Sequence, residues 1–165
     1  LSGFPQMPEV IEDGETIEEN AVKKAREVYH HTGILSLADD TGLFVDYLLG
    51  APGVYSSRYA GENVTYADNN KKLLKELKGV PPRKRTARFK CCVALFGNNV
   101  CKTFTGITEG KILTESKGNN GFGYDPLFLP DGFDNTYAQL DDADKNKISH
   151  RYKALQLAKE FLRGI

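Results

Sequence analysis

The chain has 165 residues, of which 40% are hydrophobic and 27% are charged. This balance is typical of a globular protein with one substantial core, and it excludes a disordered chain and a pair of independent domains. The 22 Lys and Arg residues equal the 22 Asp and Glu residues, so the formal net charge is zero. Binding nucleic acid mainly through its phosphates needs a basic excess, and a membrane span needs ~20 consecutive apolar residues. The sequence has neither of these features and opens on no signal-peptide pattern, so we expect a soluble, cytoplasmic protein with no nucleic-acid or membrane partner.

The three cysteines predict no disulfide framework. Cys91, Cys92 and Cys101 are few and lie close together, and no histidine lies near them at the spacing of a metal site. We therefore expect buried, reduced thiols on two strands.

The first predicted helix begins after Thr16, because Thr16 and Glu19 have the spacing of a capping box. It extends to about Gly33. The residues of its buried face recur every three or four positions: Ile17, Ala21, Ala25 and Val28.

A pair of acids interrupts the apolar pattern that follows this helix. Residues 34–38 fit a short buried strand that ends at Asp39 and Asp40, and a second apolar run begins at Leu43. Carboxylates between two core strands are costly to bury without a partner, so this pair is the first candidate for a chemical role. A turn or a helix cap is the alternative for an Asp-Asp pair taken alone.

More carboxylates lie upstream, in the loop before the first helix. Glu9, Glu12 and Asp13 can fold back toward the strand end that carries Asp40. Proteins hold Mg²⁺ with converging carboxylates that leave room for water and for substrate phosphates. The two acidic segments therefore predict a Mg²⁺ site.

The remaining elements can be predicted from turn residues, caps and apolar periodicity. In chain order we expect a turn at 50–53, a helix from Thr65 to about Lys78, strands at 87–96 and 100–108, a further strand at 111–113, and a last helix that begins near Ser149. The buried stripe of the last helix is expected to consist of Leu155, Ala158, Phe161 and Leu162. Because helices and strands are interspersed around a central hairpin, the predicted class is α/β or α+β with a mixed sheet.

The start of the last helix is unusually basic. Ser149 can cap the helix, which leaves His150 and Arg151 in the first turn beside the free backbone N–H groups. Cations are not favoured at a helix N-terminus, so they suggest a ligand such as an oxygen-rich anion or a purine carbonyl. A solvated basic turn is the alternative.

A glycine-rich loop at 118–126 is a second candidate binding element. Its glycines allow the backbone to approach a planar ligand, an aromatic side chain such as Phe122 offers a stacking face, and Asp125 can accept hydrogen bonds from ring nitrogens. A tight turn around a buried tyrosine is the alternative. The sequence contains neither a P-loop nor a dinucleotide-binding glycine motif.

Five segments, taken in this order, resemble the inosine triphosphate pyrophosphatase family, whose members are also called dITP/XTP pyrophosphatases. The matching stretches are GETIEENAVKKA (14–25), ADDTGLFVDYLLGAPGVYSSRYAG (38–61), GNNGFGYDPLFLPDG (118–132), TYAQL (136–140) and KNKISHRYKAL (145–155). They cover nearly the whole chain, and five motifs in the family's order are much more specific than any one of them.

The resemblance implies a single domain over residues 1–165, with a two-lobed mixed α/β fold in which helices flank a long, twisted, mixed sheet and a central cleft. It implies a homodimer that uses one or more Mg²⁺ ions to hydrolyse ITP, dITP and XTP to the monophosphate and pyrophosphate, which removes deaminated purines from the nucleotide pool. The alternatives are a Maf-like pyrophosphatase for other modified nucleotides and a nucleotide-binding module with impaired catalysis.

The resemblance also implies roles for individual residues. Asp40 is expected to be a metal ligand or the water-activating base, with Glu12, or else Glu9 or Asp13, as the second metal-binding carboxylate. The expected substrate contacts are Thr41, Lys24, Phe122, Gly123, Tyr124, Asp125, Lys145, His150 and Arg151. The residues expected to flank or border the site are Asp39, Ser57 and Arg58.

Recognition of the base is expected to depend on hydrogen-bond donors. His150 and Arg151 can donate to the O6 acceptor of hypoxanthine or xanthine, whereas adenine carries an amino group at that position. Guanine also carries O6, and these two residues do not explain how it would be rejected.

The sequence departs from the family at its start. Family members open with a strand and an S/T-x-N-x-x-K loop that binds the triphosphate, and no such motif stands before Leu1. We therefore expect a family segment of roughly 30 residues to be absent, with an open sheet edge near Asp40 as the result.

Overall fold

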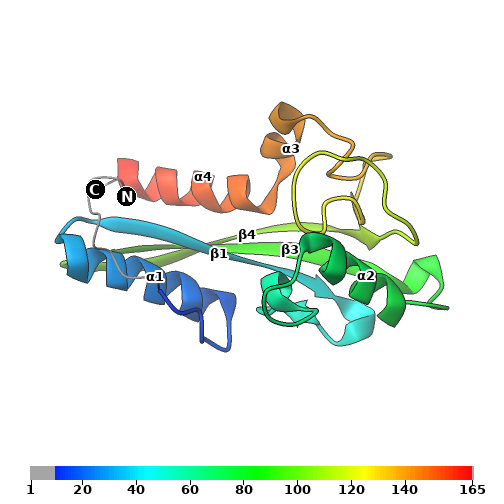
Figure 1. The fold of residues 1–165 in the computed structure, drawn as a ribbon. Coiled ribbons are helices and arrows are strands. Elements are labelled where there is room, and N and C mark those ends of the chain that lie inside the picture. The colour runs from blue at the N-terminus through cyan, green and yellow to red at the C-terminus, as the bar shows by residue number, and fades with distance from the viewer. Residues whose placement is uncertain (1–9, 165) are drawn as a thin grey trace.

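The protein consists of a five-stranded sheet with helices on both of its faces (Figure 1). The computed structural model describes residues 10–164. Its helices are α1 (Ile17–Thr32), α2 (Tyr66–Glu76), α3 (Asp142–Ile148) and α4 (His150–Arg163), with short 3₁₀ turns η1 (Asp46–Leu48), η2 (Ser56–Arg58) and η3 (Pro82–Lys84). Its strands are β1 (Ser36–Val45), β2 (Pro52–Gly53), β3 (Thr86–Gly97), β4 (Val100–Ile112) and β5 (Phe128–Pro130), in the spatial order β2-β1-β3-β4-β5. The α/β class is confirmed, but every described pairing is antiparallel, where the sequence predicted a mixed sheet.

Local capping signals correctly predict where the long helices begin. The Thr16 hydroxyl accepts a hydrogen bond from the Glu19 amide at 3.1 Å, and the Glu19 carboxylate accepts one from the Thr16 amide. Thr65 and Asp68 make the same reciprocal pair at the start of α2. The Ser149 hydroxyl accepts from an amide of the first turn of α4, as predicted. Each cap satisfies N–H groups that have no partner within the helix.

The prediction that two strands flank the acidic pair is wrong. β1 runs without a break through Asp39 and Asp40 and pairs with β3 along its whole length. Ile34 and Leu35, predicted to be buried in a strand, precede β1 and are exposed. The strand continues because each aspartate finds a partner from a helix, which sequence periodicity cannot reveal.

One edge of β1 is open in the described part of the chain. β3 pairs with one side of the strand, and β2 covers the other side only at Leu43 and Phe44. Within residues 10–164, positions 36–42 therefore have a strand partner on one side alone. This agrees with the expected open edge near Asp40.

The central hairpin is longer than predicted. Residues 111–112 continue β4 and do not form a separate strand, because β4 stays paired with β3 as far as the Thr86–Lys111 register. The short elements β5 and α3 were not predicted, since three and seven residues are too few to establish a hydrophobic period.

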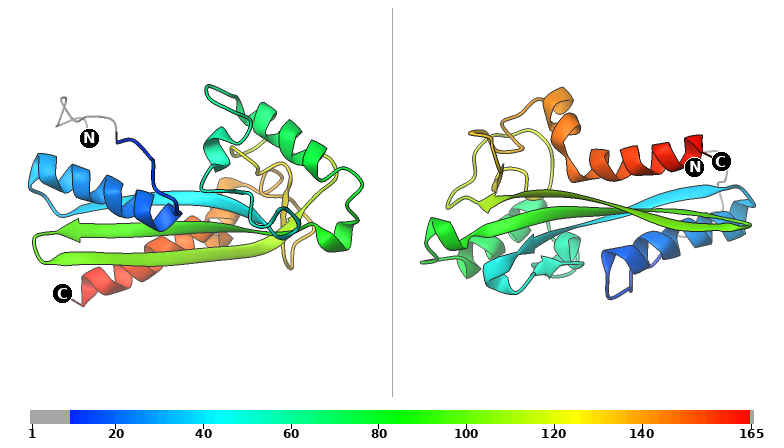
Figure 2. Two further views of the ribbon diagram at one scale, coloured as in Figure 1. Left: turned by 90° about the horizontal axis from the view of Figure 1, so that it is seen from below. Right: turned by 180° about the vertical axis from the view of Figure 1, so that it is seen from behind.

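The sheet separates two helical layers (Figure 2). α1 packs on one face, where Ala21 and Ala25 meet Cys92 and Ala94 of β3. On the opposite face, the small residues of α4 meet Cys91 and Val93. The predicted stripe of α4 is correct at Ala158, whereas Leu155 and Leu162 are exposed and Ala154 is buried.

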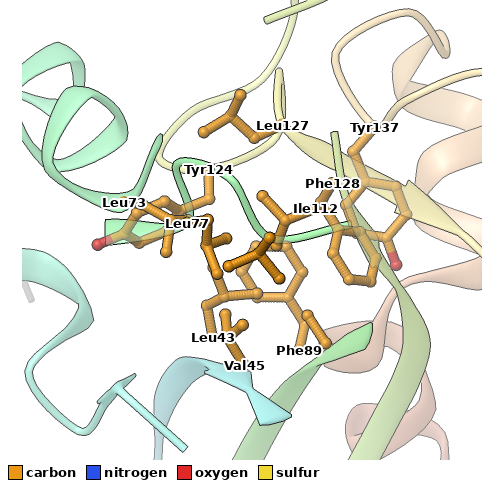
Figure 3. Close-up of a cluster of buried hydrophobic side chains, with 12 residues drawn as sticks. Leu43, Val45, Leu73, Leu77, Phe89, Ile112, Tyr124, Leu127, Phe128 and Tyr137 are labelled. Atoms are coloured by element: carbon orange, nitrogen blue, oxygen red, sulfur yellow. The ribbon is translucent and has the colours of Figure 1, made fainter. Parts of the chain in front are cut away.

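In the described residues, the largest cluster of buried hydrophobic side chains joins one end of the sheet to α2, β5 and the neighbouring loops, and Figure 3 shows its members. Leu43, Phe89 and Tyr137 belong to it, together with residues of β5 and α2. Of the cysteines, Cys91 and Cys92 are buried and free as predicted, but Cys101 is exposed, because it follows the hairpin turn at the end of the sheet. In the described residues, no helix has the length and apolar character to cross a bilayer.

Candidate functional site

A cavity of about 620 Å³ brings nearly all of the predicted site residues together. It lies between the N-terminal ends of α1, α2 and α4 and the loop that precedes β5. The predicted residues that line it are Glu12, Lys24, Asp39, Asp40, Thr41, Ser57, Phe122, Gly123, Tyr124, Asp125, Lys145, His150 and Arg151. Its volume is in the usual range for a small-molecule site.

Strand alternation sends the two acids to opposite faces of the sheet. Asp40 lies opposite Cys92 in the register with β3 and so shares its face with α1. Asp39 lies opposite Val93 and shares its face with α4. Both line the same cavity, because at these positions no described strand covers the outer edge of β1. The cavity therefore extends around this edge, with one aspartate on each side.

On the α1 side, two carboxylates converge on one ammonium group. Lys24 Nζ donates to Glu12 Oε1 at 2.9 Å and to Asp40 Oδ1 at 2.9 Å. Burial, together with the negative charge of Glu12, raises the pKa of Asp40 above its ordinary value despite the contact with Lys24. Burial alone would lower the pKa of Lys24, but its hydrogen bonds to both carboxylates raise it, so the ammonium stays charged.

The structure distinguishes Glu12 from the other acids of its loop. Asp13 is turned away from the cavity and pairs with Lys23 at 2.6 Å on the surface. Glu9 lies outside the described residues. Arg58, expected to border the nucleotide, instead donates from Nη2 to the backbone oxygen of Glu12 at 3.0 Å and so supports this loop.

Sequence reasoning missed Asn20. This side chain is 1% exposed and lies between Asp40 and the loop that carries Glu12. Its position in the sequence could have indicated a role, because Asn20 stands beside Ala21 on the buried face of α1. A buried amide is unusual there and needs hydrogen-bond partners.

On the α4 side, Asp39 orients Arg151. Its Oδ2 accepts from Arg151 Nε at 3.0 Å and is also 3.0 Å from Nη2, while Arg151 Nη2 reaches the Thr41 hydroxyl at 3.4 Å. The Cys91 thiol lies 3.6 Å from the same carboxylate oxygen, and burial raises its pKa to about 12, so it stays protonated. Arg151 is thus held at the cavity by two side chains of β1.

The glycine-rich loop is fixed by its own aspartate. Asp125 Oδ2 accepts from the Phe122 amide at 2.8 Å and from Lys145 Nζ at 2.5 Å. Gly121 has φ +74°, and a Cβ there would come within 2.1 Å of the same oxygen, so the turn requires glycine. Asp125 and Lys145, both predicted to contact the substrate, therefore form a salt bridge with each other.

Contacts from the other side of the cavity hold the loop in place. Asn70 of α2 donates to the Gly123 carbonyl at 3.0 Å, and the Tyr124 hydroxyl donates to the Ser56 carbonyl at 3.0 Å. Phe122 remains 52% exposed at the cavity, with Lys145 Nζ 4.8 Å from the centre of its ring. The loop thus offers a half-exposed aromatic face beside a charged group.

His150 lies in the first turn of α4, as predicted, and is buried there, which excludes the alternative of a solvated turn for this side chain. Its ring stacks on Phe89 with centroids 4.7 Å apart and an interplanar angle of 11°, and its Nδ1 has no hydrogen-bond partner in the described residues. Burial, with the nearby charges of Arg151 and Lys145, lowers the pKa of His150 to about 3. The imidazole is therefore neutral at physiological pH.

The sequence of the chain matches a known protein family along nearly its whole length. The model of the Ham1 family matches residues 1–161. The chain belongs to the Ham1 family. A dITP/XTP pyrophosphatase from Desulforamulus reducens is 54% identical over 163 residues, which are 98% of this chain and 81% of that protein. One from Geobacter sulfurreducens is 51% identical over 163 residues, with coverage of 98% and 82%.

Solved structures of the Ham1 family have the same fold. A HAM1 protein from Coxiella burnetii matches with a TM-score of 0.93 at 42% identity, over 99% of this chain and 84% of that chain. The Staphylococcus aureus Ham1 protein matches with a TM-score of 0.93 at 41% identity and the same coverage. The resemblance inferred from the five sequence segments is confirmed.

Proposed function

We propose that this chain hydrolyses the triphosphates of deaminated purines, namely dITP, XTP and ITP, to the monophosphate and pyrophosphate. The observation that carries the proposal is that one cavity extends around the open edge of β1. It joins two carboxylates and Lys24, which with a bound metal ion would suit phosphates, with an aromatic and cationic region, suited to a purine. The names of the Ham1 relatives from Desulforamulus reducens and Geobacter sulfurreducens support this substrate class.

The residues fit a divalent metal ion. The carboxylates of Glu12 and Asp40 already converge on one cation, the ammonium of Lys24. Within residues 10–164, no three His, Cys, Asp or Glu side chains form a metal cluster. Two converging carboxylates suit Mg²⁺, which proteins bind with one or two carboxylates while waters and substrate phosphates complete the coordination. Mg²⁺ held by Asp40 and Glu12 would neutralise phosphate charge and acidify a bound water.

The chain's own groups divide the remaining tasks. Asp40 accepts the proton of the water that attacks the α-phosphorus, and pyrophosphate leaves. Lys24 keeps its positive charge and stabilises the charge that develops on the phosphates. Phe122 stacks on the base, and Arg151, fixed by Asp39, donates from its remaining N–H groups to O6.

Pyrophosphate release from a panel of nucleotides tests the proposal. We expect ITP, dITP and XTP to be preferred over ATP and dTTP by on the order of 100-fold or more in kcat/KM, and EDTA to abolish the activity. GTP belongs in the panel because it shares O6. A preference for dTTP would favour the Maf-like alternative, and ITP binding without pyrophosphate release would favour a binding module.

We also propose a homodimer, which light scattering would detect.

A further inference from the structure

We infer that Asn20 is a positioning residue, which holds the loop of Glu12 against Asp40 and so sets the geometry of the proposed metal site. The inference rests on the proposed function, because it assigns a role within that site. It is carried by the contacts at the two ends of one buried amide.

Each end of the Asn20 amide has a different partner. Its Oδ1 accepts from the Gly14 amide at 2.8 Å, and its Nδ2 donates to Asp40 Oδ2 at 3.3 Å. Lys24, one helical turn further along α1, takes the other oxygen of Asp40 and reaches Glu12. Asn20 and Lys24 therefore lie on the same face of α1 and together fix both carboxylate oxygens of Asp40.

The surroundings of Asn20 exclude other side chains. Alanine would leave a backbone N–H and a carboxylate oxygen without partners, and aspartate would place a second carboxylate against Asp40. A longer amide has no room, because Asn20 is 1% exposed and even a Cβ on Gly14 would come within 2.7 Å of its Oδ1. Asparagine alone has both the length and the donor-acceptor pair that the site needs.

The chain contains a matched control in Asn69. It is the fourth residue after the N-cap Thr65, as Asn20 is the fourth after Thr16, and it is 2% exposed. Its Oδ1 accepts from the Ala60 amide at 2.7 Å and its Nδ2 donates to the Ser57 carbonyl at 2.9 Å, so it bridges backbone groups only. Both amides brace a loop, but only Asn20 contacts a carboxylate of the site.

The experiment compares Asn20→Ser with Asn69→Ser in the full chain. Mn²⁺ binding to the nucleotide-free protein is measured by EPR, the Mg²⁺ concentration for half-maximal ITP hydrolysis by kinetics, and the fold by circular dichroism. For Asn20→Ser we expect two metal constants to rise by on the order of 10-fold or more: the dissociation constant for Mn²⁺ and the Mg²⁺ concentration for half-maximal hydrolysis. The reason is that metal affinity is sensitive to groups that orient the ligands. We expect kcat to fall while KM for ITP at saturating Mg²⁺ changes less than about threefold. Asn69→Ser should lower thermal stability without moving the metal constants.

A second pair of variants covers the case in which Asn20→Ser does not fold. Asn20→Asp keeps the volume and the acceptor for the Gly14 amide but replaces the amide donor to Asp40 by a carboxyl group, so kcat per folded molecule, with the folded fraction measured by circular dichroism, should fall, whereas Asn69→Asp should not change kcat in this way. Equal metal constants in the wild type and Asn20→Ser, or equal losses in the Asn20 and Asn69 variants, would overturn the positioning role while the proposed function stands. A wild type without metal-dependent hydrolysis and without Mn²⁺ binding would overturn the proposed metal site and this inference together.

Discussion

Asp40 combines three features that seldom occur together in a structural carboxylate. It is buried, it contacts a lysine and an asparagine, and it lines a cavity that solvent can enter. Burial raises its pKa, which makes its carboxylate a stronger base than an ordinary surface aspartate. A buried carboxylate with a raised pKa in a cavity is a candidate for a chemical role, which supports the proposed role of Asp40 as the base.

Asp40→Asn keeps the shape of the side chain and removes its charge. We expect pyrophosphate release from ITP to fall by about 100-fold or more, since an amide is a poor ligand for Mg²⁺ and cannot accept the proton. The matched control is Asp13→Asn, because Asp13 belongs to the neighbouring loop but pairs only with the surface residue Lys23. Near wild-type turnover of Asp40→Asn, with an unchanged melting temperature, would show that Asp40 is structural.

Arg151→Ala tests recognition of the base. The ratio of kcat/KM for ITP to that for ATP should fall by on the order of 10-fold, because the donor to O6 is lost together with the penalty against an amino group. Lys153→Ala is the control, since Lys153 lies on the same helix and donates to the Ile107 carbonyl outside the cavity. A uniform loss on both substrates would assign Arg151 to the phosphates or to structure.

The packing of α4 on the sheet depends on the absence of a side chain at Gly106 of β4. A Cβ at this position would lie 2.0 Å from the backbone oxygen of His150 and 2.5 Å from the backbone nitrogen of Ala154. Neither backbone atom can move without shifting α4. This close approach explains why alanines, and not the predicted leucines, form the buried stripe of the helix.

Gly106→Ala should therefore destabilise the protein by about 1–3 kcal/mol or more, as overpacked cores do. Gly97→Ala at the end of β3 is the matched control, because its Cβ would meet chiefly the Leu35 side chain, which is about half exposed and can rotate away. Urea unfolding of the two variants measures the difference. Equal stabilities would mean that α4 shifts at little cost.

The elements that the sequence predicted correctly are those whose signals are local. Thr16, Thr65 and Ser149 each mark a helix start through a partner three residues away. The continuity of β1 could not be predicted this way, because Lys24 and Arg151, the partners of Asp40 and Asp39, lie 16 and 112 positions away in the chain.

For the candidate site too, local motifs could be predicted from the sequence and long-range contacts could not. Its residues were recognisable as motifs, and the cavity brings them together. Their partners were not: the Asp125-Lys145 pair, the stacking of His150 on Phe89 and the bridge made by Asn20 all depend on tertiary packing. Sequence patterns thus identify the side chains of the candidate site, whereas the fold determines which of these side chains contact one another.

In the molecule as a whole, the sheet acts as a partition between two chemically different regions. Glu12, Asp40 and Lys24 lie on the α1 side, while Arg151, its partner Asp39 and the aromatic loop lie on the α4 side. The open edge of β1 joins the two regions into one cavity. A nucleotide that spans this edge would contact both helical layers, so its binding should stabilise the whole fold rather than one layer.

The buried, neutral His150 links the stability of the whole molecule to pH. The folded state binds its proton only near pH 3, whereas an unfolded histidine binds one below its ordinary pKa of 6.5. Between these two values the unfolded state holds more protons, so stability rises with pH in this window and falls on acidification. From pH 7 to pH 5.5 the loss of stability due to His150 should be about 1 kcal/mol.

Urea unfolding of the wild type and of His150→Gln at both pH values isolates this contribution, because Asp40 and the other titrating groups are common to the two proteins. We expect the wild type to lose about 1 kcal/mol more than the variant, and equal losses would mean that His150 is accessible to protons in the folded state.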